Sequence, residues 1–495
     1  MLVLALYAML VFFAVAQLRI LVLAGYCLTK DLGHPTVGLA PTTDIAWPTV
    51  AVQLPVYREY RVLGRLIEAV TELEYPKGQL CVQVLDDSEA EEAERTRKVV
   101  DAFHGGGVAI TYVHRGTRDG YKSGALNHGT RLLDCELIAI FDADFVPERN
   151  FLMRTVPSLA IERVGAVHTR WRHRNDTASA LTMLQAAVLD SLFCFESATR
   201  QASGESSMYL GTSGVWRRRT IEELGGWREA PFTDDGIDLS FRARLAGWLV
   251  VFVNEALASS DLPETYVAYK NQQRRWARAA LRLFLDYGRG ALQPAGGAGR
   301  RFLELSSLHL VLSTPALIVV GVLTGAQVAL GLPRTAGWTA VQLGLSAALV
   351  LFPPVQEGIL AQRLLYRDWK QRCLRLLPAL PLGIGVSVSI LAGFRDTFRR
   401  DAPEFVRTPK QGAEGVILTS GARWVRTAAC IATAESALGG VLLAAGTVAV
   451  VRGYAESWFL LFALAGAFLT ACGRSWSEIR RQVGHASPGN RAFAP

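Results

Sequence analysis

Long apolar runs near both ends of the sequence enclose a central region of soluble composition. The first run covers residues 2–28, and a transmembrane helix needs about 20 apolar residues, so this run is a predicted span. Four more predicted spans lie at 305–330, 338–360, 427–451 and 457–472. Arginines and lysines cluster beside these runs, which is typical of the cytoplasmic side of a membrane. The sequence therefore predicts a multi-pass protein of a bacterial inner (plasma) membrane with about five spans.

The net charge of +8 fits this membrane pattern, so no nucleic-acid partner is expected. Seven cysteines occur without a Cys-x-x-Cys pair, so neither a zinc site nor a disulfide framework is expected. Reduced, buried thiols are therefore expected.

The apolar stretch 374–398 is different from the five predicted spans. It contains prolines and glycines, and basic segments follow it as well as precede it. An interfacial or re-entrant segment keeps both basic segments in the cytoplasm, and a folded-back pair of short spans is the alternative. The predicted parts are an N-terminal transmembrane helix (1–30), a cytoplasmic α/β domain (45–285), a transmembrane hairpin (286–372), an interface helix and loop (373–424), a second hairpin (425–475) and a cytoplasmic tail (476–495).

Strand-like and helix-like segments alternate four times in the first part of the soluble region. Such alternation favours a parallel sheet with right-handed crossovers, and it places the carboxyl ends of the strands on one edge. The predicted strands are 49–54, 80–85, 108–113 and 138–141, and the predicted helices are 62–74, 89–103 and 123–133.

Charged residues follow three of these strands. Asp86 and Asp87 follow the second strand, Arg115 follows the third, and Asp142 and Asp144 follow the fourth. Ligands bind at the carboxyl ends of the strands in open α/β sheets. An Asp-x-Asp pair there suits a hard divalent cation that also holds the phosphates of a substrate. The sequence therefore predicts a metal and phosphate site at this edge.

Three further segments carry charges in suggestive patterns. The glycine-containing segment 115–127 has basic side chains for a diphosphate, or it is a basic surface loop. The acids of 232–240 could include a general base or could stabilise a helix N-terminus, and both can hold. The segment 272–276 (QQRRW) would, alone, be an interfacial anchor beside the membrane.

Taken together, these segments resemble one family. Asp87, Asp142-Ala-Asp144, Thr233-Asp-Asp235 and Gln272-x-x-Arg-Trp276 resemble the D, DxD, TED and QxxRW motifs of inverting family 2 glycosyltransferases. That class includes membrane-embedded cellulose, mannan and hyaluronan synthases. Residues 405–412 (FVRTPKQG) resemble the gating loop of cellulose synthase. The resemblance covers about residues 47–475. It implies an α/β GT-A domain, with a Rossmann-like mixed sheet, inserted in an α-helical transmembrane region with interface helices.

The resemblance also implies roles for individual residues. The usual glutamate of the TED triplet is Asp234 here, so Asp235 is the expected base and Asp234 its rival. A Mg²⁺ or Mn²⁺ ion is expected on Asp144 and Asp142. The implied nucleotide-sugar ligands are Asp86, Asp87, Arg115, Lys122, Asp142, Gln272 and Arg275; the acceptor residues are Trp276, Trp216, His173 and Asp190; and the gating loop contributes Phe405, Arg407, Thr408 and Lys410.

The expected function is transfer of a hexose from UDP-glucose or GDP-mannose to a growing β-linked glycan at the cytoplasmic face, with export through the same chain. The acceptor segment 190–196 lacks a histidine expected of the family, so a lipid acceptor and a glycolipid synthase that stops after one sugar remain the alternative. A catalytically silent scaffold is disfavoured because all four motifs keep their acids. Glu435, an acid in a predicted span, would line a sugar channel or lie at the membrane interface.

Overall fold

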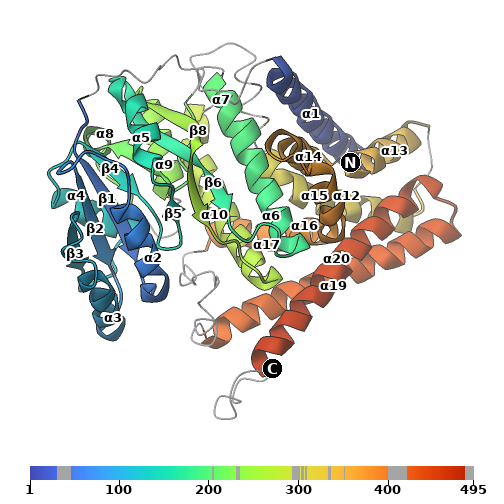
Figure 1. Ribbon diagram of the computed structural model, residues 1–495. Helices are drawn as coiled ribbons and strands as arrows, with labels where there is room; N and C mark the ends of the chain where they lie inside the picture. Colours follow the sequence, from blue (N-terminus) through green and yellow to red (C-terminus); the bar gives the residue numbers. More distant parts are fainter. Residues whose placement is uncertain are drawn as a thin grey trace. The chain divides into compact units, whose positions relative to one another are not determined.

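The structure is a computed structural model of the chain (Figure 1). It describes residues 1–29, 46–202, 206–229, 235–291, 302, 306, 309–332, 336–350, 352–399 and 421–484. The chain divides into two compact units. We call residues 26–175 and 192–262 the α/β unit, and residues 1–25, 176–191 and 263–495 the helical unit.

The α/β unit is built on one eight-stranded sheet with the strand order β3-β2-β1-β4-β7-β6-β8-β5. The first four of these strands are parallel neighbours, as the alternating pattern predicted. β7 runs antiparallel to β4 and β6, so the sheet is mixed, as the family resemblance implied. The strands are β1 (Val50–Val56), β2 (Leu80–Asp86), β3 (Ala109–His114), β4 (Leu137–Ile140), β5 (Val146–Pro147), β6 (Val164–His173), β7 (Gly214–Arg217) and β8 (Leu249–Ser260).

Helices cover both faces of this sheet (Figure 1). Val50 and Val52 of β1 lie in one core with apolar residues of α2, α3 and α5, whereas Ala51 lies in the other with residues of α4, α8 and α9. Because alternate strand residues point to opposite faces, a strand covered on both faces is apolar throughout. The helices are α2 (Tyr60–Thr71), α3 (Ala90–Asp101), α4 (Tyr121–Arg131), α5 (Phe151–Thr155), α7 (Ala198–Ala202), α8 (Arg218–Glu223) and α9 (Asp235–Leu245).

One strand boundary differs from the prediction. The sequence suggested that the first strand ends before Pro55, but β1 continues through it to Val56. β4 pairs with β1 only as far as Gln53, so the missing N–H of Pro55 breaks no ladder bond with β4.

The helical unit consists of long apolar helices and several short ones. Its helices are α1 (Leu2–Thr29, which runs past the unit boundary), α6 (Ala180–Ser191), α10 (Tyr266–Ala291), α12 (His309–Ala329), α13 (Ala336–Val350), α14 (Pro353–Leu365), α15 (Trp369–Leu376), α16 (Leu380–Gly385), α17 (Ser387–Thr397), α19 (Gly421–Val451) and α20 (Ala455–Gly484). Apolar side chains of α1, α12, α13, α19 and α20 share one core.

Among the described residues, seven helical segments are long and apolar enough to cross a membrane. Five of them coincide with the predicted spans. The other two are Ala180–Gln201 and Trp369–Thr397. The second includes most of the stretch that we predicted to be interfacial, and it folds as α15, a short 3₁₀ turn, α16 and α17. The number of spans and the proposed part boundaries stay predictions.

Candidate active site

The carboxyl ends of β1, β2 and β3 are in register. Val56 is opposite Asp86, and Asp86 is opposite His114. Backbone hydrogen bonds continue one residue further, because the Asp87 N–H donates to the Val56 carbonyl (3.0 Å) and the Arg115 N–H donates to the Asp86 carbonyl (3.0 Å). The edge predicted from the sequence therefore brings the segments that carry Asp86, Asp87 and Arg115 together.

Asp86 holds the turn after β2. Its side chain is completely buried, the Ser88 N–H donates to its Oδ1 (2.8 Å), and the Tyr112 hydroxyl donates to its Oδ2 (2.9 Å). Both carboxylate oxygens thus accept hydrogen bonds from the α/β unit itself. The alternation of β3 places Tyr112 beside Asp86, a relation that the sequence analysis missed.

Asp87 forms a two-bond ion pair with Arg115. The guanidinium donates from Nε to Oδ1 (2.7 Å) and from Nη2 to Oδ2, and the pair is mostly buried. Burial raises the pKa of Asp87, while the guanidinium opposes that rise. Arg115 also donates to the carbonyls of Asp119 and Tyr121 (3.1 Å each). One arginine therefore fixes both the acid after β2 and the basic loop after β3.

That loop turns into α4 at Gly120, which has a left-handed backbone (φ 69°). A Cβ at this position would lie 2.8 Å from the Glu229 Cγ. Both the left-handed backbone and this close approach therefore favour glycine at position 120. The Arg118 guanidinium lies 3.4 Å from the centroid of the Tyr57 ring and 5.0 Å from that of Tyr121. The aromatic rings hold this cation at the loop surface.

Lys122 and Asp142 meet beside the segment before β7. The Lys122 ammonium donates to Asp142 Oδ1 and to the Gly211 carbonyl (2.8 Å). The Asp142 N–H donates to the Thr212 hydroxyl (2.9 Å). No sequence pattern predicted these contacts of Gly211 and Thr212, because they are tertiary.

Asp142 and Asp144 supply two carboxylates for a divalent cation whose remaining ligands would come from a substrate. No group of three or more His, Cys, Asp or Glu side chains that could hold a metal occurs in the described part of the chain. Mg²⁺ commonly binds one or two carboxylates and completes its shell with phosphate oxygens and water. Asp144 is 8% exposed and Asp142 is half-buried, so both carboxylates are partly desolvated.

The remaining predicted residues of the α/β unit have varied positions. Asp235 is the first residue of α9. Trp216 is completely buried, and its ring packs 5.7 Å from that of Trp227, so its observed role is packing. His173 is buried at the end of β6 near the Ser260 hydroxyl (3.4 Å). Asp234 and the gating-loop residues Phe405, Arg407, Thr408 and Lys410 lie outside the described residues.

Four predicted residues belong to the helical unit. Gln272, Arg275 and Trp276 are half-buried on α10. Asp190 on α6 is buried and accepts a hydrogen bond from Gln362 (2.8 Å). Gln362 in turn accepts one from Arg372 (2.6 Å), which also pairs with Asp176. Asp190 is thus part of a buried polar chain within the helical unit.

Comparisons with known proteins agree with the motifs. Residues 48–279 match the family model described as "Glycosyltransferase like family 2". The chain is 39% identical over 290 residues to the probable glucomannan 4-beta-mannosyltransferase 7 of Oryza sativa subsp. japonica. The aligned region is 54% of this chain and 49% of that relative. It is 38% identical over 248 residues to the glucomannan 4-beta-mannosyltransferase 1 of Cyamopsis tetragonoloba, in an alignment that covers 48% of this chain and 46% of that relative. The chain thus spans about half the length of these curated relatives.

A solved structure shares the fold. The mannosyltransferase PcManGT from Pyrobaculum calidifontis, in complex with GDP-Man and Mn²⁺, superposes with a TM-score of 0.56 at 20% identity, over 81% of this chain and all of that one.

The mixed sheet, covered by helices on both faces and ending in acidic turns, defines a GT-A-type domain. Residues 48–279 of this chain match a glycosyltransferase domain of family 2, in agreement with the family that the motifs predicted, and the mixed sheet confirms the predicted fold class.

Proposed function

We propose that this protein transfers mannose from GDP-mannose to a growing β-linked glycan. UDP-glucose and GDP-mannose were equally open from the sequence. The names of the plant relatives, glucomannan 4-beta-mannosyltransferases, and the GDP-Man in the Pyrobaculum calidifontis structure favour the mannose donor. Transfer of a single sugar to a lipid acceptor would replace this proposal with that of a glycolipid synthase.

The observation that carries the proposal is that two ion pairs lie at the same edge of the sheet. Asp87–Arg115 and Lys122–Asp142 both lie at carboxyl ends of the parallel strands, and Asp144 is two residues from Asp142. An ammonium and a guanidinium beside carboxylates suit a ligand that brings both a nucleoside and phosphates. We assign Asp86 and Asp87 to the nucleoside side, with Asp86 acting through the turn that it holds.

Asp142 and Asp144 would hold Mg²⁺ or Mn²⁺. Bound there, the cation would neutralise charge on the diphosphate of the leaving nucleotide. Lys122 now neutralises Asp142, so its ammonium is already held beside the carboxylates before a donor binds. The same ammonium would then stabilise the charge that develops on the diphosphate, together with Arg275.

Asp235 is proposed as the base that takes the proton from the acceptor hydroxyl. A base on the face of the sugar opposite the leaving group gives a single displacement and inversion, as in inverting glycoside hydrolysis. Asp235 is the first residue of α9, and acidic residues are favoured near the positive end of a helix dipole. Trp276 would stack on the acceptor sugar and Gln272 would bind the donor, and the family match includes both because it extends to residue 279.

The remaining assignments concern the membrane. We place the spans in the plasma membrane, the inner membrane in a bacterium, with the α/β unit on the cytoplasmic side, and we propose that the helical unit exports the chain. The apolar helices and the basic segments beside them support this orientation. Phe405, Arg407, Thr408 and Lys410 would close over the donor, and His173 and Asp190 are retained as acceptor-side residues.

The rival bases can be separated by paired substitutions. We expect Asp235→Asn to lower kcat for mannosyl transfer by roughly 10²- to 10⁴-fold, with the donor KM nearly unchanged, because a general base contributes about that much to the rate. Asp234→Asn should lower kcat less than tenfold. The measurement is steady-state transfer by purified protein in lipid nanodiscs with GDP-[¹⁴C]mannose. The reverse order of effects would make Asp234 the base, and no effect of either substitution would contradict the proposed chemistry.

A further inference from the structure

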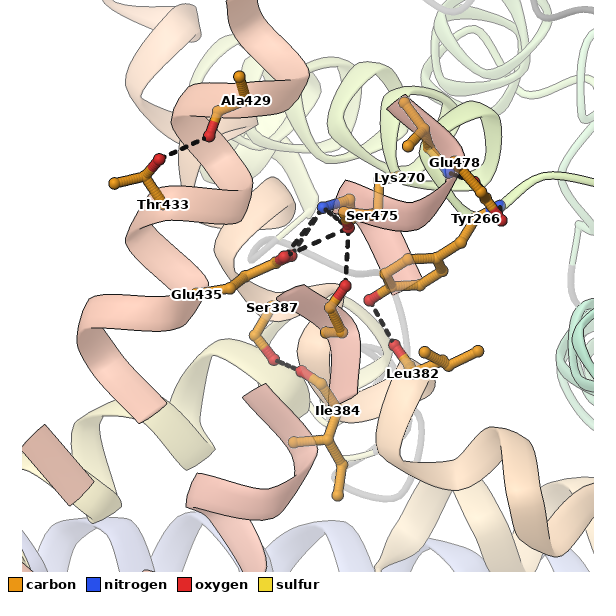
Figure 2. A network of polar contacts seen from close by, with 12 residues as sticks. Tyr266, Lys270, Leu382, Ile384, Ser387, Ala429, Thr433, Glu435, Ser475 and Glu478 are labelled. Carbon is orange, nitrogen blue, oxygen red and sulfur yellow. Dashed lines mark hydrogen bonds and ion pairs between the residues drawn. The ribbon is translucent and has the colours of Figure 1, made fainter. Parts of the chain in front are cut away.

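A buried ion pair anchors α10, the helix that carries the QxxRW motif. The Lys270 ammonium donates to Glu435 Oε1 (2.8 Å) and Oε2 (3.1 Å) and to the Ser475 hydroxyl (2.7 Å). All three donors of the ammonium are therefore used. Lys270 is 2% exposed, and Glu435 and Ser475 are completely buried. Figure 2 shows the three side chains converging from α10, α19 and α20.

The start of α10 is held by a second acid of α20. The Glu478 carboxylate accepts hydrogen bonds from the backbone N–H groups of Tyr266 and Val267 (3.0 Å each). The first N–H groups of a helix have no partner within it, so this carboxylate caps α10 from another helix. The Tyr266 hydroxyl donates to the Leu382 carbonyl (2.9 Å), which ties the same turn to α16 (Figure 2).

A third contact fixes the next turn against α17. Arg274 donates from Nε to Asp396 Oδ2 (2.6 Å). A Cβ at Gly393 would lie 2.3 Å from the Arg274 carbonyl, so α17 approaches the α10 backbone closely. Tyr266, Lys270 and Arg274 follow one another at intervals of four residues and therefore share one face of α10.

The motif side chains project from the opposite face. At about 100° per residue, Gln272 and Arg275 lie roughly 200° and 140° around the helix from Lys270, and Trp276 lies roughly 240° around. A rotation or slip of α10 at Lys270 would therefore displace all three motif side chains together.

We propose that the Lys270–Glu435–Ser475 network positions α10, and that Lys270 and Glu435 are thereby positioning residues for the Gln272, Arg275 and Trp276 side chains. The inference rests on the proposed transferase function. A buried ion pair is a weak source of stability, because desolvation offsets its attraction, so we assign this pair the role of specifying one arrangement of its partners. Glu435 is consequently bound to α10, a partner that its sequence position did not indicate, and its exposed fraction of 0% differs from that of a channel-lining side chain.

The test compares two isosteric substitutions in the same unit. Glu435→Gln removes the charge that faces Lys270. Glu357→Gln removes an equally buried charge that pairs with Arg19 (3.2 Å) on α1 and contacts His309 (3.2 Å) on α12. Each variant is purified as the full chain in nanodiscs. Amide hydrogen exchange of residues 266–280 is measured together with the kcat and donor KM of mannosyl transfer.

We expect exchange within 266–280 to rise at least tenfold in Glu435→Gln and less than twofold in Glu357→Gln. The kcat should fall at least tenfold in Glu435→Gln, with a donor KM within twofold of the parent, and should change less than threefold in Glu357→Gln. Unchanged exchange and kcat in Glu435→Gln would overturn the inference, as would equal losses in the two variants.

A double substitution guards against simple misfolding. Lys270→Met in the Glu435→Gln background removes the stranded ammonium, so it should restore folding yield without restoring the kcat to within threefold of the parent. Full recovery of kcat would overturn the positioning role, because no ion pair then remains. If the unsubstituted protein shows no transfer, the proposed function fails, whereas the exchange comparison still decides whether Lys270 and Glu435 anchor α10.

Discussion

The acid pair after β4 illustrates how neighbouring charges prepare a site. Asp142 is held by Lys122 and its backbone N–H by Thr212, while Asp144 is nearly buried. Two carboxylates so close in sequence repel one another, and the ammonium offsets that repulsion until a divalent cation binds. The pair could be read from the sequence, because Asp-x-Asp follows an apolar strand.

The Asp144→Asn substitution tests the proposal that the Asp144 carboxylate binds the divalent cation. The substitution keeps the shape of the side chain but removes the charge that would hold the cation. We expect the kcat for transfer to fall roughly 10²- to 10³-fold, since the metal is assigned several kcal/mol of charge stabilisation. The Mn²⁺ concentration for half-maximal rate should rise at least tenfold. Metal titrations of transfer from GDP-mannose give both quantities.

Asp134→Asn is the matched control, because this aspartate is fully exposed. It should leave both the rate and the metal dependence within twofold of the parent protein. Full transfer by the parent in excess EDTA would contradict the metal assignment, as would an Asp144→Asn variant with an unchanged metal requirement.

The Lys270–Glu435 pair shows why other side-chain contacts could not be read from the sequence. The two residues are 165 positions apart. No local pattern connects them, because Glu435 lies in a predicted span and Lys270 lies in the soluble region just before Gln272. Their contact depends on the packing of α10 against α19 and α20.

At the scale of elements, the first half of the sheet was predictable and the second was not. β1 to β4 alternate with helices along the sequence, and this alternation predicts parallel pairing, which the structure shows. β6 and β8 are parallel neighbours, yet the paired residues Val164 and Leu249 are 85 positions apart in the sequence. β7 enters antiparallel between β4 and β6. Such pairings depend on tertiary packing, which local periodicity does not encode.

The docking of α4 on the sheet yields a test at the same scale. A Cβ at Gly129 would lie 2.4 Å from Gln83 Oε1 and 2.7 Å from Gln53 Nε2. These two buried amides are hydrogen-bonded to each other (3.0 Å), so they cannot retreat without losing that bond. We expect Gly129→Ala to destabilise the α/β unit by about 1–3 kcal/mol, as overpacking generally does. The midpoint of denaturant unfolding, followed by tryptophan fluorescence, measures the loss.

Gly64→Ala provides the control on α2. Its new Cβ would lie 3.7 Å from Val99 Cγ1, an ordinary contact, and alanine is favoured over glycine in a helix by about 1 kcal/mol. This variant should be as stable as the parent or more so. Equal stability of Gly129→Ala and Gly64→Ala would mean that α4 does not pack as the structure shows.

At the scale of the whole molecule, hydropathy predicted the helices but not their breaks. All five predicted spans are helical segments that are apolar enough to cross a membrane. The stretch 374–398 has the same hydropathy, yet Pro378 and Pro381 lie where the helix divides into short pieces. Proline removes a backbone donor and clashes with the preceding turn, so a broken path could be anticipated there. Length and composition identify the helices that could cross a membrane, whereas the number that do cross depends on how they sit in a bilayer.

The central proposal is that this chain builds a β-linked glycan from GDP-mannose, and product analysis tests it most directly. Purified full-length protein in lipid nanodiscs is incubated with Mn²⁺ and either GDP-[¹⁴C]mannose or UDP-[¹⁴C]glucose. The products are then divided by solvent extraction and digested with endo-β-mannanase. We expect the label from GDP-mannose to enter a polymer that solvent does not extract and that the mannanase degrades, at a rate at least tenfold above that from UDP-glucose. Label confined to a solvent-extractable lipid that carries one sugar would contradict the proposal.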